Sequence, residues 1–218
     1  MSSNREWESD RNLQFVSVII PVYNDPEGIR RCLSALEEQT YPETKFEILA
    51  VDNGSTDETP SVIEEFSATL LVEDEVQGSY AARNAGIEHA EGDVLAFTDA
   101  DCTPDPEWVE QGVETLNRED ADMAAGRIVF EYTDEKSAAE RYDASMNMRN
   151  DESVREGVAK TGNLFVRRRV VERVGVFPEQ LRSGGDVFWT NRRQTPGSNS
   201  CTHTRLACVT RADSSSSY

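Results

Sequence analysis

Short runs of consecutive apolar residues alternate with segments of helical periodicity over the first half of the chain. The runs predict strands at 16–22, 46–51, 69–73, 93–98 and 123–131. Between the first two runs, apolar positions from Ile29 to Leu36 recur at helical spacing after Asp25 and Pro26, a capping residue and a proline suited to the first helical turn. Strands that alternate with helices are typical of an α/β fold with a parallel sheet and right-handed crossovers.

The same alternation continues along the chain. The first helix is expected to end near Thr40, and further helices are expected at 57–66, after Gly78, over 106–118 and across the polar segment 134–150. The sequence GNLFVRR predicts a short strand, and RRVVERVG predicts a helix that ends at Gly175. We therefore expect a Rossmann-like, mostly parallel sheet that is flanked by helices.

Polar side chains stand where three of the predicted strands end. They are Tyr23 and Asn24 after VSVIIPV, Asp52 and Asn53 after EILAV, and Asp99 and Asp101 after DVLAFT. In an open parallel sheet, ligands bind in the crevice beyond the carboxyl ends of the strands. Asp99 and Asp101 are two residues apart, so in an extended stretch both can face one ligand. Paired carboxylates without His or Cys suit Mg2+ or Mn2+, which substrate phosphates also help to hold.

Length and composition limit the classes of protein to consider. The 218 residues suit one principal domain, which we place at 15–190. A disordered N-terminal tail is expected at 1–14, and an atypical tail, disordered or non-native, is expected at 191–218. The chain carries 41 acidic and 22 basic residues, a net charge of −19, which argues against a nucleic-acid partner. Acidity combined with arginine in place of lysine resembles the composition of halophilic proteins from a high-salt cytoplasm.

The apolar segments are too short for a membrane protein. The longest, FVSVIIPVY, is less than half of the ~20 residues that a membrane helix needs, so no integral membrane segment is expected. The N-terminal residues lack the apolar core of a secretory signal, which favours a cytoplasmic location. Cys32, Cys102, Cys201 and Cys208 have neither zinc-ligand spacing nor a secreted context, so we expect reduced thiols.

Five motifs together resemble family 2 glycosyltransferases, which have the GT-A fold. They are VSVIIPVYN, AVDNGSTDET, GSYAARNAGIEHAEGDVLAFTDADCTPDPEW, GNLFVRR and SGGDVFWT, in the family's order over roughly residues 15–190. The resemblance implies transfer of a sugar from a nucleotide diphosphate to an acceptor hydroxyl or phosphate, with inversion. It also implies a divalent metal, Mg2+ or Mn2+, and a glycan or polyprenyl phosphate acceptor. A lipid-linked acceptor would imply peripheral contact with the inner face of the cell membrane.

The resemblance implies that residues at the ends of the first two strands bind the nucleotide. Pro21, Val22 and Tyr23 would lie beside the nucleoside, with the Tyr23 ring against the base. Asp52 and Asn53 would read the base edge and the ribose. Asn53 stands where many relatives have a second aspartate, and because its amide both donates and accepts hydrogen bonds, the choice of base stays open.

The resemblance implies roles in the reaction for four further residues. Arg83 would face the diphosphate, since a guanidinium pairs well with phosphate oxygens; a surface arginine is the alternative reading. Asp99 would contact the ribose or the metal, and Asp101 would hold the metal. Asp186, in GGD, matches the general base, and an N-cap of the following helix is a role that it could share.

The segment after Asn191 departs from the family. Residues 1–190 carry 40 acidic and 18 basic residues, whereas residues 191–218 carry one acidic residue and four arginines. One hypothesis is a shift of reading frame near codon 191, and resequencing of the gene decides it. The competing hypothesis for function is accordingly a truncated or frameshifted, catalytically impaired family member that only binds nucleotide.

Other classes of α/β protein fit the residues less well. A receiver-like phosphoacceptor domain requires two acids after the first strand and a late lysine, but the chain has Tyr23 and Asn24 and no lysine beyond Lys160. A sugar-nucleotide pyrophosphorylase requires a basic, glycine-rich loop after the first strand, which is missing. A dinucleotide-binding oxidoreductase requires G-x-G-x-x-G at the same place, which is also missing.

Overall fold

The centre of the molecule is a mixed sheet of six strands in the order β3-β2-β1-β4-β8-β6. The computed structural model describes residues 13–126, 128–131, 159–181, 183–192 and 212–215. The strands are β1 (Val16–Val22), β2 (Phe46–Asp52), β3 (Thr69–Val72), β4 (Val94–Thr98), β6 (Met123–Ala125) and β8 (Asn163–Arg167). The first four are parallel, and β8 runs antiparallel to both β4 and β6. The mostly parallel, Rossmann-like sheet is confirmed.

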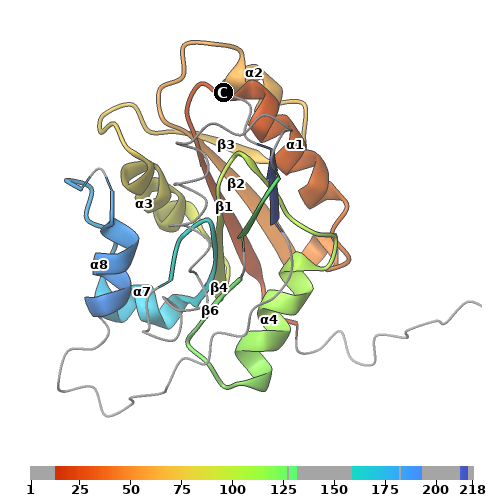
Figure 1. The fold of residues 1–218 in the computed structure, drawn as a ribbon, viewed down its shortest axis with the longest axis vertical. Coiled ribbons are helices and arrows are strands. Elements are labelled where there is room, and N and C mark those ends of the chain that lie inside the picture. The colour runs from red at the N-terminus through yellow and green to blue at the C-terminus, as the bar shows by residue number, and fades with distance from the viewer. Residues whose placement is uncertain (1–12, 127, 132–158, 182, 193–211, 216–218) are drawn as a thin grey trace, which may run out of the picture.

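Helices cover both faces of this sheet. They are α1 (Pro26–Glu37), α2 (Thr59–Ile63), α3 (Ser79–His89), α4 (Trp108–Arg118), α7 (Arg168–Val174) and α8 (Gly185–Arg192), with a 3-10 turn at Glu43–Lys45. In Figure 1, α1, α2 and α4 lie on one side of the strands, and α3, α7 and α8 lie on the other. As the sequence predicts, Pro26 opens α1, and the Asp25 carboxylate accepts a hydrogen bond from the Gly28 amide.

Two apolar cores form because successive residues of a strand point to opposite faces of the sheet. In β1, Val18 and Ile20 pack into the core beneath α1 and α4, whereas Ile19 packs into the core beneath α3. A strand that is buried on both faces reads as a continuous apolar run, which is why VSVIIPV and VLAFT identify β1 and β4. The second core includes Tyr80, Phe177 and Trp189, so it extends to the segment that carries Asp186.

Helix α4 approaches β8 so closely that a side chain at Gly112 has no room. A Cβ atom there would lie 2.4 Å from the ring of Phe165, which Trp108 also contacts at a centroid distance of 4.7 Å. Alanine favours a helix, but overpacking of a core lowers the unfolding free energy by about 1–3 kcal/mol, and we expect Gly112→Ala to be destabilised within that range. Chemical denaturation in high salt measures the free energy of unfolding. Glu114→Ala, at an exposed position of the same helix, is the control and should change this free energy little.

The structure corrects several predicted boundaries. The strand expected at 123–131 is two strands, because Gly126 leaves β6 where a Cβ would lie 2.2 Å from the Asn163 side chain, and the chain turns into β7 (Ile128–Glu131). The helix expected at 57–66 spans only Thr59–Ile63, with the Thr59 amide donating to the Asp57 carboxylate. Helix α1 ends at Glu37 rather than near Thr40, and α4 begins at Trp108. The helix expected at 134–150 lies outside the described residues.

A second, small sheet lies beyond the end of β4. Strand β5 (Cys102–Thr103) pairs antiparallel with β9 (Ala212–Ser215), which in turn pairs parallel with β7. Within the segment 191–218, the described residues are the last two of α8 and the four of β9. Cys201 and Cys208 are outside the described residues, whereas Cys32 and Cys102 are buried free thiols.

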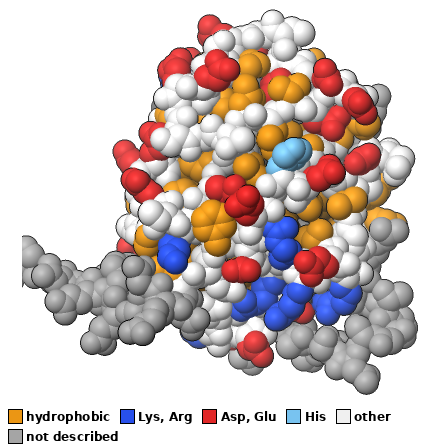
Figure 2. All heavy atoms as spheres, turned by 180° about the vertical axis from the view of Figure 1, so that it is seen from behind, with side chains coloured by type: hydrophobic (Ala, Val, Ile, Leu, Met, Phe, Trp, Pro, Cys, Tyr) orange, Lys and Arg blue, Asp and Glu red, His pale blue; other side chains and the backbone are white. Residues whose placement is uncertain are grey.

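The surface is predominantly acidic. Figure 2 shows Asp and Glu side chains spread over one face of the molecule, with Lys and Arg gathered toward its lower edge. At the junction of β8 and α7, Arg168 donates to the carbonyl oxygens of Ala90 and Gly92, which directly follow α3. Arg167 likewise donates to the carbonyl oxygens of Leu116, in the last turn of α4, and of Ala121, just beyond it, so these two cations stabilise the C-terminal ends of the two helices. In the described part of the chain, no helix has the length and apolar character needed to cross a membrane.

Candidate active site

The strand order brings the predicted polar residues to one edge of the sheet. From β1 the chain proceeds outward to β2 and β3, and then returns to place β4 on the other side of β1. Such a reversal opens a crevice at the carboxyl ends of the two central strands. Asp52 ends β2 in register with Val22 of β1, and the loop that carries Asp99 and Asp101 follows β4. The sequence-predicted clusters therefore converge.

Tyr23 directly follows β1, at the carboxyl end of this strand. Pro21 and Val22 complete β1, and the Val22 side chain is buried, whereas Tyr23 is 52% exposed. Asn24 has a positive φ of 50°, and the turn is tied to the next loop by two hydrogen bonds. The Asn24 amide donates to Ser55 Oγ at 2.8 Å, and the Thr56 amide donates to Asn24 Oδ1 at 2.8 Å. The exposed ring thus stands beside a cross-linked pair of loops.

Asp52 presents an acceptor that the protein itself does not use. The residue is 3% exposed, and its Oδ2 accepts a hydrogen bond from the Ser55 amide at 3.0 Å. Its Oδ1 is buried and has no hydrogen-bond partner. A buried acceptor without a partner lowers stability by about 1–3 kcal/mol, so its persistence is a feature to be explained.

The Asn53 side chain forms hydrogen bonds with the protein backbone, whereas the resemblance implies contacts with the nucleotide. Its amide donates to the carbonyl oxygens of Glu73 and Val76 at 2.7 and 2.9 Å, and its Oδ1 accepts from the Gly78 amide at 2.6 Å. Both N–H groups are therefore used to shape the loop that leads into α3. In this conformation Asn53 has no amide hydrogen left for a base edge.

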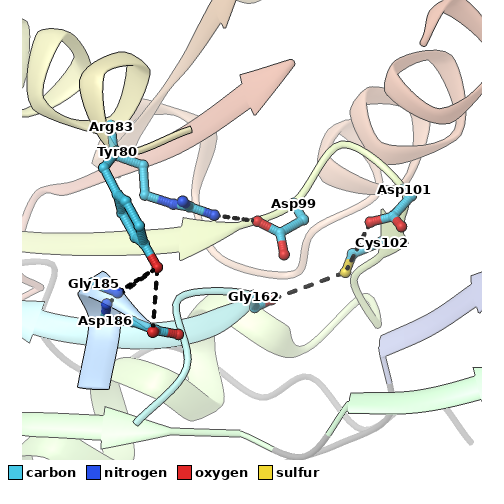
Figure 3. Close-up of polar contacts among 8 residues, drawn as sticks. All are labelled: Tyr80, Arg83, Asp99, Asp101, Cys102, Gly162, Gly185 and Asp186. Carbon is cyan, nitrogen blue, oxygen red and sulfur yellow. Dashed lines mark hydrogen bonds and ion pairs between the residues drawn. The ribbon is translucent and has the colours of Figure 1, made fainter. Parts of the chain in front are cut away.

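Arg83 lies in α3 and reaches the loop that follows β4. It is 4% exposed, and its Nη2 forms an ion pair with Asp99 Oδ1 at 2.5 Å. Its Nε–H is buried without a partner. The guanidinium also lies over the Tyr80 ring, 5.7 Å from the ring centroid. Figure 3 shows it directed at Asp99. The alternative reading as a surface arginine is wrong, because the side chain is buried.

The two aspartates after β4 form an electrostatically unfavourable pair. Loss of hydration raises the pKa of Asp101, and the negative charge of Asp99 raises it further. The Asp99 carboxylate also lies against Gly162, where a Cβ would be 2.9 Å from Oδ2. A dication between the carboxylates would relieve their repulsion. Among the described residues no group of three or more His, Cys, Asp or Glu side chains could hold a metal, so substrate and water would supply the other ligands.

Cys102 follows the pair but is not a suitable ligand. Burial, together with the charges of Asp99 and Asp101, raises the pKa of its thiol far above the ordinary value. The protonated Sγ lies 3.9 Å from Asp101 Oδ1 and 4.0 Å from the Gly162 carbonyl oxygen. A neutral thiol is a poor partner for Mg2+ or Mn2+, so we assign Cys102 to packing.

Asp186 lies in the first turn of α8. Its Oδ1 accepts hydrogen bonds from the Tyr80 hydroxyl at 3.3 Å and from the Val187 amide at 2.8 Å. Because Asp186 is inside the helix that begins at Gly185, the N-cap role that the sequence also allows is wrong. Figure 3 shows Tyr80 between Asp186 and Arg83, with Arg83 directed at Asp99.

Sequence comparison decides the family. The model of glycosyltransferase family 2 matches residues 17–175, which include the strand ends, Arg83 and both aspartates after β4. The chain belongs to this family. The family resemblance of the motifs is thereby confirmed.

Individual relatives agree with this assignment. Glycosyltransferase AglE of Haloferax volcanii is 52% identical over 191 residues, which are 85% of this chain and 63% of that protein. The chain thus spans less than two thirds of the length of this curated relative. The mannosyltransferase PcManGT of Pyrobaculum calidifontis, solved with GDP-Man and Mn2+, has a TM-score of 0.69 and 25% identity, covering 93% of this chain and 57% of that one.

A second solved structure confirms the fold. TarS of Staphylococcus aureus, residues 1–349 with UDP, has a TM-score of 0.65 at 23% identity and covers 81% of this chain and 54% of that chain. With PcManGT, this likeness confirms the expected GT-A fold.

Two residues of the site carry no role in the sequence interpretation. Tyr80 connects Asp186 to Arg83, and Asn84 donates to the Phe177 carbonyl oxygen at 2.9 Å and accepts from the Phe177 amide at 2.9 Å. With Arg83 they follow the helical spacing i, i+3, i+4 on one face of α3. That spacing was the available signal, but it does not reveal what lies opposite the face.

Proposed function

We propose that the chain transfers a sugar from a nucleotide diphosphate to an acceptor hydroxyl, with inversion and with help from a divalent metal. The observation that carries this proposal is the pair of buried, unpartnered polar atoms, Asp52 Oδ1 and Arg83 Nε, at one edge of the sheet. One is an acceptor suited to a ribose hydroxyl or a base imide, and the other is a donor suited to a phosphate oxygen. The complexes of TarS with UDP and of PcManGT with GDP-Man support a nucleoside diphosphate as part of the ligand.

The nucleoside lies against β1 and β2 in this proposal. The exposed Tyr23 ring stacks on the base beside Pro21 and Val22. Asp52 accepts a hydrogen bond from the nucleoside through Oδ1. Asn53 acts indirectly, because its hydrogen bonds hold the loop 73–78 at the start of α3.

The diphosphate lies between α3 and the loop after β4. Arg83 contacts the phosphate oxygens, and Asp99 and Asp101 would hold Mg2+ or Mn2+. The bound metal would neutralise charge that develops on the leaving nucleoside diphosphate. In the structure the Arg83 guanidinium is paired with the Asp99 carboxylate. On binding, the guanidinium exchanges this carboxylate for phosphate.

Asp186 acts as the general base. It removes the proton from the acceptor hydroxyl as that oxygen forms a bond to the anomeric carbon, and the bond to the diphosphate oxygen breaks on the opposite face. A single displacement of this kind inverts the anomeric carbon. A phosphate monoester is largely ionised at pH 7, since its second pKa is about 6, and it needs no base. The presence of Asp186 therefore favours a glycan hydroxyl over polyprenyl phosphate as the reacting group.

The contact between Arg83 and the diphosphate gives the first test. We expect Arg83→Gln to weaken binding of the nucleoside diphosphate by about 10- to 100-fold, since a hydrogen bond to a charged group contributes roughly 1.5–3 kcal/mol. Binding of the corresponding nucleoside should change little. Calorimetry measures both, with exposed Arg118→Gln as the control for loss of one positive charge. Equal losses for nucleoside and diphosphate would contradict the assignment.

Turnover tests the proposed function as a whole. The full chain is incubated in high salt with Mn2+ and each of a panel of UDP-, GDP- and dTDP-sugars, with glycan and polyprenyl phosphate acceptors, and release of nucleoside diphosphate is followed. Release that depends on an acceptor supports the proposal, and the anomeric configuration of the product tests inversion. A chain that binds a nucleotide without any turnover would favour the impaired, nucleotide-binding alternative, which the charge reversal after Asn191 suggests.

A further inference from the structure

We propose that Tyr80 is a positioning residue that holds the general base Asp186 in its reactive orientation. The proposal rests on the proposed function, because Asp186 has this role only in a transferase. Tyr80 lies in α3, whereas Asp186 lies 106 residues later in α8, so the contact joins two distant parts of the chain. The hydroxyl makes three hydrogen bonds to the same two residues, Gly185 and Asp186.

These hydrogen bonds fix both the backbone and the carboxylate. The Tyr80 hydroxyl oxygen accepts from the Gly185 amide at 2.8 Å and from the Asp186 amide at 3.3 Å, and its hydrogen is donated to Asp186 Oδ1 at 3.3 Å. The first two satisfy amides at the start of α8, where a helix has no partners of its own. The third selects one carboxylate oxygen. Figure 3 shows the phenol directed at this turn.

The two carboxylate oxygens of Asp186 therefore have different environments. Oδ1 is occupied by the Tyr80 hydroxyl and by the Val187 amide. Among the residues that the structure describes, no hydrogen bond reaches Oδ2. Oδ2 is therefore the oxygen that remains for the acceptor proton, and the Tyr80 contact determines where it points.

The Tyr80 ring also packs closely against its neighbours. A Cβ at residue 185 would lie 2.6 Å from the ring, so only glycine allows α8 to begin at this distance. The Tyr80 ring also stacks on the Phe177 ring, at a distance of 5.9 Å between the ring centroids. Burial raises the pKa of the phenol and the Asp186 charge acts in the same direction, so at neutral pH the hydroxyl keeps the proton that it donates.

Tyr80 also connects the base to the donor side of the site. The Arg83 guanidinium lies over the Tyr80 ring and is paired with Asp99, one helical turn along α3. Asn84, the next residue, holds the Phe177 backbone through two hydrogen bonds. One face of α3 thus sets the spacing between the diphosphate contact and the base.

Tyr80→Phe tests the proposal because it removes the hydroxyl and keeps the ring. We expect kcat to fall by about 10- to 100-fold, with donor Kd and KM within about twofold, since a hydrogen bond to a charged group is lost outside the donor contacts. Amide hydrogen exchange at Gly185 and Asp186 should also become faster. Tyr41→Phe is the matched control, because the buried Tyr41 hydroxyl donates to the Gln14 carbonyl oxygen at 2.7 Å away from these residues. It should change neither kcat nor exchange in α8.

The two measurements separate this proposal from the one on which it rests. Unchanged exchange at Gly185 and Asp186 in Tyr80→Phe overturns the positioning role, whether or not the wild type turns over. Faster exchange with unchanged kcat also overturns it, because the hydroxyl would then be structural only. Absence of turnover by the wild type with every donor and acceptor overturns the proposed function and with it the role of Tyr80 in a reaction.

Discussion

Asp186→Asn is expected to reduce turnover by about 10²- to 10⁴-fold, the range that a positioned general base contributes. The substitution removes the group that takes the acceptor proton but preserves its size. Donor affinity should change little, because none of the described contacts of Asp186 involves the nucleotide-side residues directly. Steady-state kinetics with an active donor and acceptor, together with calorimetry of the nucleoside diphosphate, measure the two effects.

The control is Glu172→Gln in α7, which removes one negative charge from an exposed position. It should leave both turnover and donor affinity within about twofold, as expected for a surface charge screened by salt. If Asp186→Asn keeps wild-type turnover with a hydroxyl acceptor, the base is another group. Retained turnover with only a phosphate acceptor would identify the reacting group as a phosphate.

Asp101→Asn is expected to abolish the dependence of nucleotide binding on metal. Asp99 and Asp101 stand two residues apart in the loop after β4, and burial together with the charge of Asp99 raises the pKa of Asp101. A dication held by both carboxylates would stabilise their ionised forms. Even loss of an indirect partner of a metal ligand weakens metal binding by about 10- to 100-fold, so loss of a direct carboxylate should weaken it by about 100-fold or more. Calorimetry of the nucleoside diphosphate with and without Mn2+ measures the difference.

Glu114→Gln is the matched control, since it neutralises an exposed carboxylate on α4. Wild type and this control should bind more tightly with Mn2+, whereas Asp101→Asn should bind equally with and without it. An undiminished effect of Mn2+ in Asp101→Asn would place the metal elsewhere.

The sheet was predictable because its central strands are buried on both faces. Their side chains have no polar alternation, so the runs in β1, β2 and β4 stand out, and the polar residues that follow them mark the carboxyl ends. The convergence of Asp52, Asp99 and Asp101 then follows from parallel pairing alone. The break at Gly126 could not be foreseen, since it depends on the approach of Asn163 from β8.

The sequence could not predict which side chains contact each other between distant segments of the chain. Asn53 has the right position for a base contact, but its amide hydrogens are used by the loop 73–78. Tyr80 is an aromatic residue in a helix, which most often indicates core packing, and its ring does pack against Phe177. Only the three-dimensional arrangement shows that its hydroxyl reaches α8.

Nucleotide binding by the full chain is the most direct test of the site. UDP, GDP and dTDP are titrated calorimetrically into the wild type in high salt, with and without Mn2+, and folding is verified by circular dichroism. We predict that at least one nucleoside diphosphate binds more tightly with Mn2+ and that Arg83→Gln weakens this binding. A folded chain that binds none of the three, with or without metal, would contradict the assignment of Asp52, Arg83, Asp99 and Asp101 to a nucleotide site.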